Sequence, residues 1–178
     1  DGVDLSNKDL TGVNLSGVDL SEKDLTGIIF HHANLSGVNL SNSNLTGTSL
    51  VHANLSWADL TGTNLINSDL TGAILSGVDL SNKDLTGTIL TFANLSGANL
   101  DGVDLRNKDL TGADLSGVDL SNKDLTGTIL QDAKKIEISL KQPSNSNWPA
   151  LIADQNLNVI RYDLSGDVQY IATKEGFL

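Results

Sequence analysis

The sequence predicts an all-β solenoid built from five-residue repeats, followed by a small module of β-strands. Three observations predict this fold. Leucine occupies every fifth position from Leu5 to Leu130, with Phe30 as the one replacement. Near copies of one longer segment recur at multiples of 20 residues. After residue 133 this regularity ends, and short apolar segments typical of strands take its place.

The period of five sets the path of the chain. An α-helix repeats every 3.6 residues and a strand every 2, so neither keeps every fifth residue on one face. A chain that turns a corner after each group of five residues does. We therefore expect the marker residues to point inward and to stack in columns. Representative core residues are Leu5, Leu25, Phe30, Leu45, Leu65, Leu85, Leu105 and Leu125.

The longer period gives the size of one coil. The segment SGVDLSEKDLTGII begins at Ser16, and close copies begin at Ser36, Ser76 and Ser116, so all offsets are multiples of 20. Four repeats of five residues therefore complete one coil. Coils stacked at the usual inter-strand spacing of about 4.8 Å would give about 6.5 coils and a rod of roughly 31 Å.

The residues around each leucine follow a pattern. Asp or Asn precedes it in most repeats, a small or β-branched residue lies two positions before it, and Ser or Thr, often followed by Gly, comes after it. This A-(D/N)-L-x-x pattern over residues 1–133 resembles the pentapeptide-repeat family. The resemblance implies a right-handed quadrilateral β-helix in which each repeat forms one side of a square coil.

Five lysines depart from this pattern, because they lie two positions before a leucine, where the family has a small inward residue. They are Lys8, Lys23, Lys83, Lys108 and Lys123. An ammonium group is costly to bury without a partner. We expect either that these side chains extend outward or that each pairs with the adjacent acid, which is Asp9, Asp24, Asp84, Asp109 or Asp124.

Residues 134–178 form a separate C-terminal module in this interpretation. Strands are expected at 136–140, 150–153, 158–162 and 168–172, and the last two are expected to pair as a hairpin. The open edge of the last coil needs a cover, so we interpret the module as a cap. A module that binds a partner or joins two copies of the chain is the alternative.

All of the net charge lies on the rod. Residues 1–133 hold 17 acidic and 6 basic residues, a net of −11, whereas residues 134–178 hold 5 of each. An acidic rod disfavours direct binding to nucleic acid or to an anionic membrane. The chain has no cysteine, which excludes thiolate metal sites and a cysteine nucleophile. No apolar run is long enough to span a bilayer.

The acidic residues are expected to form columns. Asp84, Asp104 and Asp124 lie 20 residues apart and would stack on one face. A basic protein is the partner that such a column favours. The net density is about one charge per 2.8 Å of rod, against about one per 1.7 Å in duplex DNA. Some members of the family that this chain resembles shield DNA gyrase by mimicking DNA, so a DNA-mimicking inhibitor or protector of gyrase or topoisomerase is an alternative function.

The histidines and exposed aromatic residues form the other candidate contact surface. His32 and His52 lie 20 residues apart and should stack; zinc sites use at least three protein ligands, and this column offers no third. Phe92 falls in the same column two coils further on. Trp57 falls at a position that is glycine in most other coils. We expect a surface stack rather than a metal site.

No catalytic, cofactor-binding or metal-binding residue is predicted. Carboxylates recur in every coil of a convex rod, where no pocket distinguishes one pKa from the next. The sequence therefore predicts a non-catalytic scaffold, monomeric or dimeric through its ends, that displays an acidic surface to another protein with a basic surface. A DNA mimic and an accessory domain of an enzyme are the alternatives.

Overall fold

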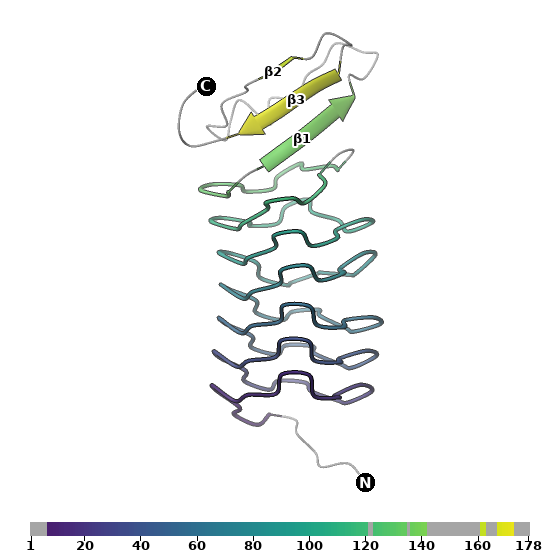
Figure 1. Cartoon of the computed structure of the whole chain (residues 1–178), viewed down its shortest axis with the longest axis vertical. Coiled ribbons are helices and arrows are strands. Elements are labelled where there is room, and N and C mark those ends of the chain that lie inside the picture. The colour runs from purple at the N-terminus through teal and green to yellow at the C-terminus, as the bar shows by residue number, and fades with distance from the viewer. Residues whose placement is uncertain (1–6, 121–122, 135, 142–160, 163–166, 173–178) are drawn as a thin grey trace.

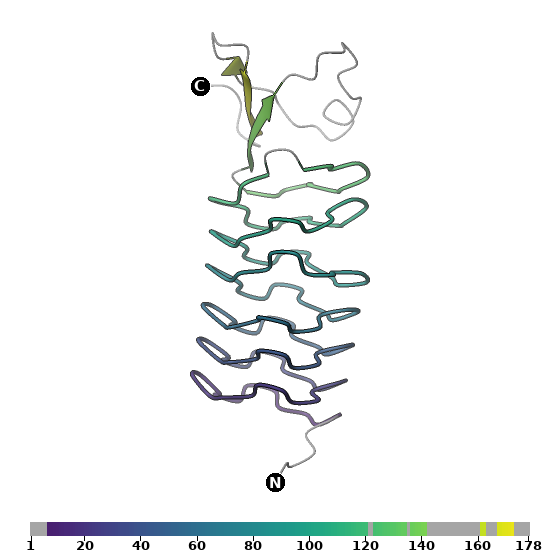
Figure 2. The same cartoon turned by 90° about the vertical axis from the view of Figure 1, so that its right-hand side faces the viewer.

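The computed structural model is a rod of stacked coils with a small sheet at its C-terminal end (Figures 1 and 2). It describes residues 7–120, 123–134, 136–141, 161–162 and 167–172. Leu5 lies outside these residues. The described part of the chain contains no helix, and hence none that could cross a membrane.

Each coil contains 20 residues, as the sequence predicts. Parallel bridges join positions 20 apart, for example Asn14 to Asn34 and Asn34 to Asn54. The amide of Leu35 donates to the carbonyl of Asn54 over 2.7 Å, and the amide of Asn54 donates to Ala33 over 2.9 Å. The main chain of one coil is therefore hydrogen-bonded to the next coil, which satisfies polar groups that the rod would otherwise leave unpaired.

The corners of the coil explain the Asp/Asn preference. The amide of Ala33 donates to Phe30 over 3.0 Å and closes a turn whose third residue, His32, has φ of 55°. A positive φ at that residue alone defines a type II turn. The side chain before the marker residue stabilises the next turn, since Oδ1 of Asn34 accepts the amide of Ser36 over 3.2 Å. Asp and Asn serve this purpose equally.

The marker residues form the core. Every core residue named above except Leu5 is described, and all of these are buried: Leu25, Phe30, Leu45, Leu65, Leu85, Leu105 and Leu125. The four buried threonines among the described residues also point inward, and each donates its hydroxyl to the carbonyl of a leucine 23 residues earlier. Thr63, for example, donates to Leu40 over 2.7 Å. Among the described residues, no buried side-chain nitrogen or oxygen lacks a hydrogen-bond partner.

Three of the five lysines take an arrangement that the sequence did not predict. Lys8 and Lys23 are exposed, but Lys83, Lys108 and Lys123 are half-buried. The Nζ atom of Lys108 donates to the carbonyls of Leu85 and Thr88, and Lys123 uses Leu100 and Val103 in the same way. Lys108 and Lys123 therefore each bond the leucine carbonyl 23 residues earlier, as threonine does at this position.

The lysines interrupt the ladder between coils. By the pattern of the other coils, the carbonyl of Thr88 would accept the amide of Asp109; it accepts Nζ of Lys108 over 3.4 Å instead. Nζ of Lys83 likewise lies 3.5 Å from the carbonyl of Thr63. Within the described residues, parallel bridges are missing after each of these lysines, where they would join Asn64 to Asp84, Ile89 to Asp109, and Asp104 to Asp124. Three further bridges are missing where a valine precedes the aspartate: Asp59 to Asp79, Asp84 to Asp104, and Asn99 to Asp119.

The C-terminal sheet has three antiparallel strands in the order β1-β3-β2. They are β1 (Ile136–Lys141), β2 (Arg161–Tyr162) and β3 (Asp167–Ala172). The strands expected near 136–140 and 168–172 are confirmed, as is the pairing of β2 with β3. The strand expected at 150–153 lies outside the described residues. The ladder of the rod extends to Lys134, whose amide donates to Ala113 over 2.8 Å.

Replacing Lys108 by threonine tests the cost of the interrupted ladder. Lys108→Thr should raise the free energy of unfolding by about 1 kcal/mol, because the hydroxyl keeps the bond to Leu85, the charge is removed, and the amide of Asp109 regains its acceptor. Urea unfolding followed by circular dichroism measures this change. Thr88→Lys, the reverse change at an equivalent position, should destabilise the rod. Equal or lower stability of Lys108→Thr would contradict the prediction.

Removing residues 136–178 tests whether the C-terminal module is a cap. The truncated rod exposes the main-chain edge of its last coil, so we expect end-to-end association that grows with protein concentration. Analytical ultracentrifugation of the full chain and the truncated chain measures it. A truncated rod that stays monomeric, with unchanged circular dichroism, would show that the module is not a cap.

Candidate interaction surfaces

The predicted contact residues lie on two opposite sides of the rod. Asp84, Asp104 and Asp124 lie on one side, which we call the Asp84 side and which comprises 23–27, 43–47, 63–67, 83–87, 103–107 and 123–127. The side ten residues away in each coil is called the Asn/Ser side; it comprises 13–17, 33–37, 53–57, 73–77, 93–97 and 113–117. Trp57 lies at one of its corners, and His32, His52 and Phe92 lie at the other. The acidic column and the aromatic residues therefore form two separate surfaces.

The carboxylates of the Asp84 side are exposed and held in the charged form. Asp84 accepts the amide of Thr86 over 2.8 Å and its hydroxyl over 2.6 Å, and these bonds lower the pKa of Asp84. Asp124 is held by Thr126 in the same way. The side-chain hydrogen bonds from Arg106 lower the pKa of Asp104 to about 2.

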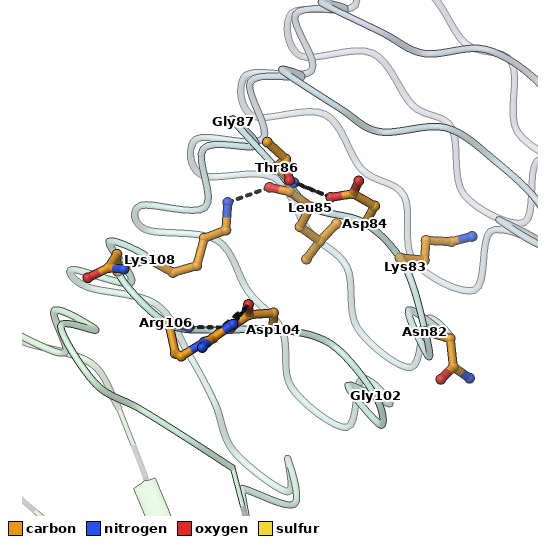
Figure 3. A pocket seen from close by; sticks show the side chains of 11 residues that line it. Asn82, Lys83, Asp84, Leu85, Thr86, Gly87, Gly102, Asp104, Arg106 and Lys108 are labelled. Carbon is orange, nitrogen blue, oxygen red and sulfur yellow. Dashed lines mark hydrogen bonds and ion pairs between the residues drawn. The ribbon is translucent and has the colours of Figure 1, made fainter.

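Cations offset much of this negative charge. Arg106 Nη2 lies 2.6 Å from Asp104 Oδ2. A cavity of about 490 Å³ opens where the ladder is interrupted, and Lys83, Asp84, Asp104, Arg106 and Lys108 are among the residues that line it. Figure 3 shows Arg106 closed on Asp104 and Lys108 reaching toward Leu85. The acidic column predicted from the sequence is thus a mixed-charge surface, because Arg106 and the lysines lie among its aspartates. A count of the acids alone does not predict this.

The most uniformly acidic surface is a neighbouring side, which we call the Asp59 side. It comprises 18–22, 38–42, 58–62, 78–82, 98–102 and 118–120, and these segments contain no lysine or arginine. Its acids are Asp19, Glu22, Asp59, Asp79, Asp101 and Asp119. Hydrogen bonds from the residue two positions later lower the pKa values of Asp19, Asp59 and Asp79. Sorting both signs of charge by coil position would have found this side in the sequence.

The two histidines stack as predicted. The ring centroids of His32 and His52 lie 5.1 Å apart, and the ring planes differ by 16°. No group of three or more His, Asp or Glu residues in the described chain is arranged to hold a metal ion. Trp57 is 74% exposed and Phe92 is 61% exposed, each with φ near 60°.

Trp57 and Phe92 each lie over a glycine of the next coil, whereas His32 lies over His52. A Cβ atom added to Gly77 would lie 2.5 Å from the ring of Trp57, and one added to Gly112 would lie 2.4 Å from the ring of Phe92. The glycine therefore leaves room for the ring of the residue 20 positions earlier. The sequence shows that each of these rings is followed by a glycine 20 positions later. Only the structure shows that the glycine is needed to make room for the ring.

Comparison with known proteins agrees with this geometry. The family model "Pentapeptide repeats" matches residues 9–47, 39–77, 75–107 and 109–134, with eight copies of the repeat. No curated protein matches the chain.

Similar solved structures include HetL, a pentapeptide repeat protein from Nostoc sp. strain PCC 7120, at 28% identity over 81% of this chain and 89% of that chain, with a TM-score of 0.24. Rfr23 from Cyanothece 51142 is 28% identical over 72% and 88%, with a TM-score of 0.20. Full-length QnrB1, a plasmid-mediated fluoroquinolone resistance protein, is 22% identical over 69% and 82%, with a TM-score of 0.22. With the repeat model matched over most of the rod, the chain belongs to the pentapeptide repeat family.

Proposed function

We propose that this protein is a non-catalytic scaffold that binds the basic surface of another protein through the acidic sides of its rod. The observation that carries the proposal is the Asp59 side, whose six acidic residues have no lysine or arginine among them. The Asp84 side extends this surface, with a weaker field because Arg106 and the lysines offset its charge. Opposite potentials steer the two proteins together and set their register.

Two further observations support a binding role over catalysis. A general acid needs a carboxyl group with a raised pKa, whereas every aspartate with a shifted pKa in the described chain is lowered. The carboxylates of Asp59 and Asp79 are also fixed in place, because each accepts the main-chain amide of the residue two positions later over 2.9 Å. A pre-organised surface loses little conformational entropy when it binds.

Substituting asparagine for aspartate tests the proposal without disturbing the turns, since Asn39 and Asn99 already occupy equivalent positions. The triple variant Asp19→Asn, Asp59→Asn, Asp79→Asn should bind a lysine-rich peptide of about 20 residues at least tenfold more weakly than the wild type in isothermal titration calorimetry. The loss should shrink as salt rises, because salt screens exposed charges.

The matched control is Asp84→Asn, Asp104→Asn, Asp124→Asn, which removes the same charge from the side that contains cations. We expect a smaller loss of affinity from this control. If both triple variants bind as the wild type does, the acidic sides are not the binding surface.

The lowered pKa values predict how this binding depends on pH. A carboxyl with a lowered pKa stays charged below the ordinary value of 3.8 and is neutralised only as pH falls through its own pKa. Binding of the peptide should therefore persist at pH 4 and decline toward pH 2. Calorimetry at pH 7, 4, 3 and 2 measures it. Separately, Arg106→Ala should raise the pKa of Asp104 from about 2 in an NMR titration. Loss of binding between pH 5 and 4 would contradict this prediction.

A DNA mimic is a second candidate, because the same row of charged carboxylates, whose own segments hold no lysine or arginine, could occupy a basic groove shaped for DNA. A gyrase supercoiling assay separates the two functions. Inhibition or protection by micromolar wild-type protein, lost in the triple variant of the Asp59 side, would favour the mimic. No effect at that concentration would leave only the protein scaffold.

A further inference from the structure

One side of this acidic rod carries no charge over most of its length. In the five segments of the Asn/Ser side between residues 13 and 97, there is no Asp, Glu, Lys or Arg, and Asp114 is the first charged residue along it. The other three sides each hold several acids. A basic partner attracted by the acidic sides has no electrostatic reason to bind the Asn/Ser side. A ligand of this side would therefore be uncharged.

The Asn/Ser side is also the most regular surface of the rod. Its parallel bridges continue without a break from Asn14 to Lys134, through Asn34, Asn54, Ile74, Asn94 and Asp114. No lysine enters this ladder between two coils, in contrast to the Asp84 side. The outward side chains of the Asn/Ser side are therefore held in a straight, rigid row with one coil spacing between them.

The row presents hydrogen-bonding groups that the protein leaves unused. Oδ1 of Asn54 accepts the amide of Ser56 over 3.0 Å, and Asn34 and Asn94 make the same bond to their serines. Within the described residues, the Nδ2 groups of these three asparagines have no acceptor. The serine hydroxyls bond within the row: Ser56 donates to Asn54 over 2.7 Å, and Ser96 donates to Ser76 over 3.1 Å. The surface thus offers neutral amide donors in most coils, with Ile74 as the apolar exception.

Aromatic rings border this row on both corners. Trp57 lies on one corner and Phe92 on the other, and both are largely exposed. A non-glycine residue with left-handed φ costs roughly 1–2 kcal/mol, and glycine avoids this cost at most equivalent corners. Exposed, strained aromatic residues are a feature that stability does not explain, and they point to binding.

The dimensions of the side select the ligand. The strand part of each side is about three residues long, so it is roughly 10 Å wide, and five coils span roughly 19 Å. The resulting area of roughly 200 Å² is far below the ~800 Å² that each partner of a stable protein complex buries. A second copy or another protein would have to extend over the acidic neighbouring sides. A narrow ligand fits the side by itself.

We propose that the Asn/Ser side binds an extended, neutral oligosaccharide that runs along the rod axis. Sugar hydroxyls match the free amide groups of the row, and the apolar face of a pyranose ring stacks on an aromatic ring such as Trp57 or Phe92. The advance per sugar of an extended β-1,4-linked pyranose chain is close to the coil spacing of about 4.8 Å. Because neighbouring sugars are turned over, sugars two apart share one orientation and meet equivalent groups two coils apart, such as Asn14, Asn54 and Asn94. This site is independent of the acidic sides.

Isothermal titration calorimetry with cellohexaose and chitohexaose, two neutral β-1,4-linked probes, tests this proposal on the full chain. Trp57→Gly and Phe92→Gly should each lower affinity at least tenfold. Glycine is native at equivalent corners such as Gly17, Gly37 and Gly72, so these variants should fold at least as stably as the wild type. Urea unfolding of each variant verifies this.

A charge variant supplies the matched control. Asn54→Asp adds a carboxylate to the neutral row and keeps the turn that Asp114 makes at the same position. Asn64→Asp makes the same change on the Asp84 side, where Asn64 accepts the amide of Ile66. Asn54→Asp should weaken binding severalfold and Asn64→Asp should not. The proposal is overturned if neither probe binds at millimolar concentration, or if Trp57→Gly and Phe92→Gly both bind as the wild type does. It is also overturned if Asn54→Asp instead dissociates a dimer seen by ultracentrifugation.

Discussion

Burial of one leucine on each side of every coil is the interaction on which the rest of this structure depends. The leucines lie in stacked columns, Leu25 below Leu45 and Leu45 below Leu65, and each is shielded from water by the coils above and below it. Burying a leucine contributes about 1.5–3 kcal/mol, and the ladder between coils satisfies the main chain that surrounds it. A chain with few aromatic residues can therefore build a long core without a wide interior.

Because the interior is fixed by the leucines, the outer surface is free to vary. The residue before each leucine has to accept a main-chain amide, and Asp59 does so as Asn39 does. The choice between a carboxylate and an amide therefore changes charge without changing the fold. This freedom explains how one rod carries an acidic side with no lysine or arginine in its own segments, a mixed-charge side and a neutral side within the same coil.

The lysines show the limit of that freedom. A residue two positions before a leucine points inward, so Lys108 has to satisfy its ammonium with the carbonyls of Leu85 and Thr88. Burial lowers the pKa of Lys108, while the nearby Asp84 and Asp104 raise it. The ammonium displaces a main-chain donor from the ladder, and a cavity opens beside it. At this position the packing of a single side chain thus interrupts the ladder between neighbouring coils.

The sequence by itself determined the period, the inward leucines, the 20-residue coil and the stack of His32 on His52, because a strict repeat leaves only one way to bury the same residue in every turn. Only the tertiary structure decided the rest. The bond from Lys108 to Leu85, the neutralisation of Asp104 by Arg106 and the ring of Trp57 over Gly77 depend on how far a side chain reaches and in which direction it turns. A repeat gives the row in which a residue lies; side-chain geometry between coils gives its partner.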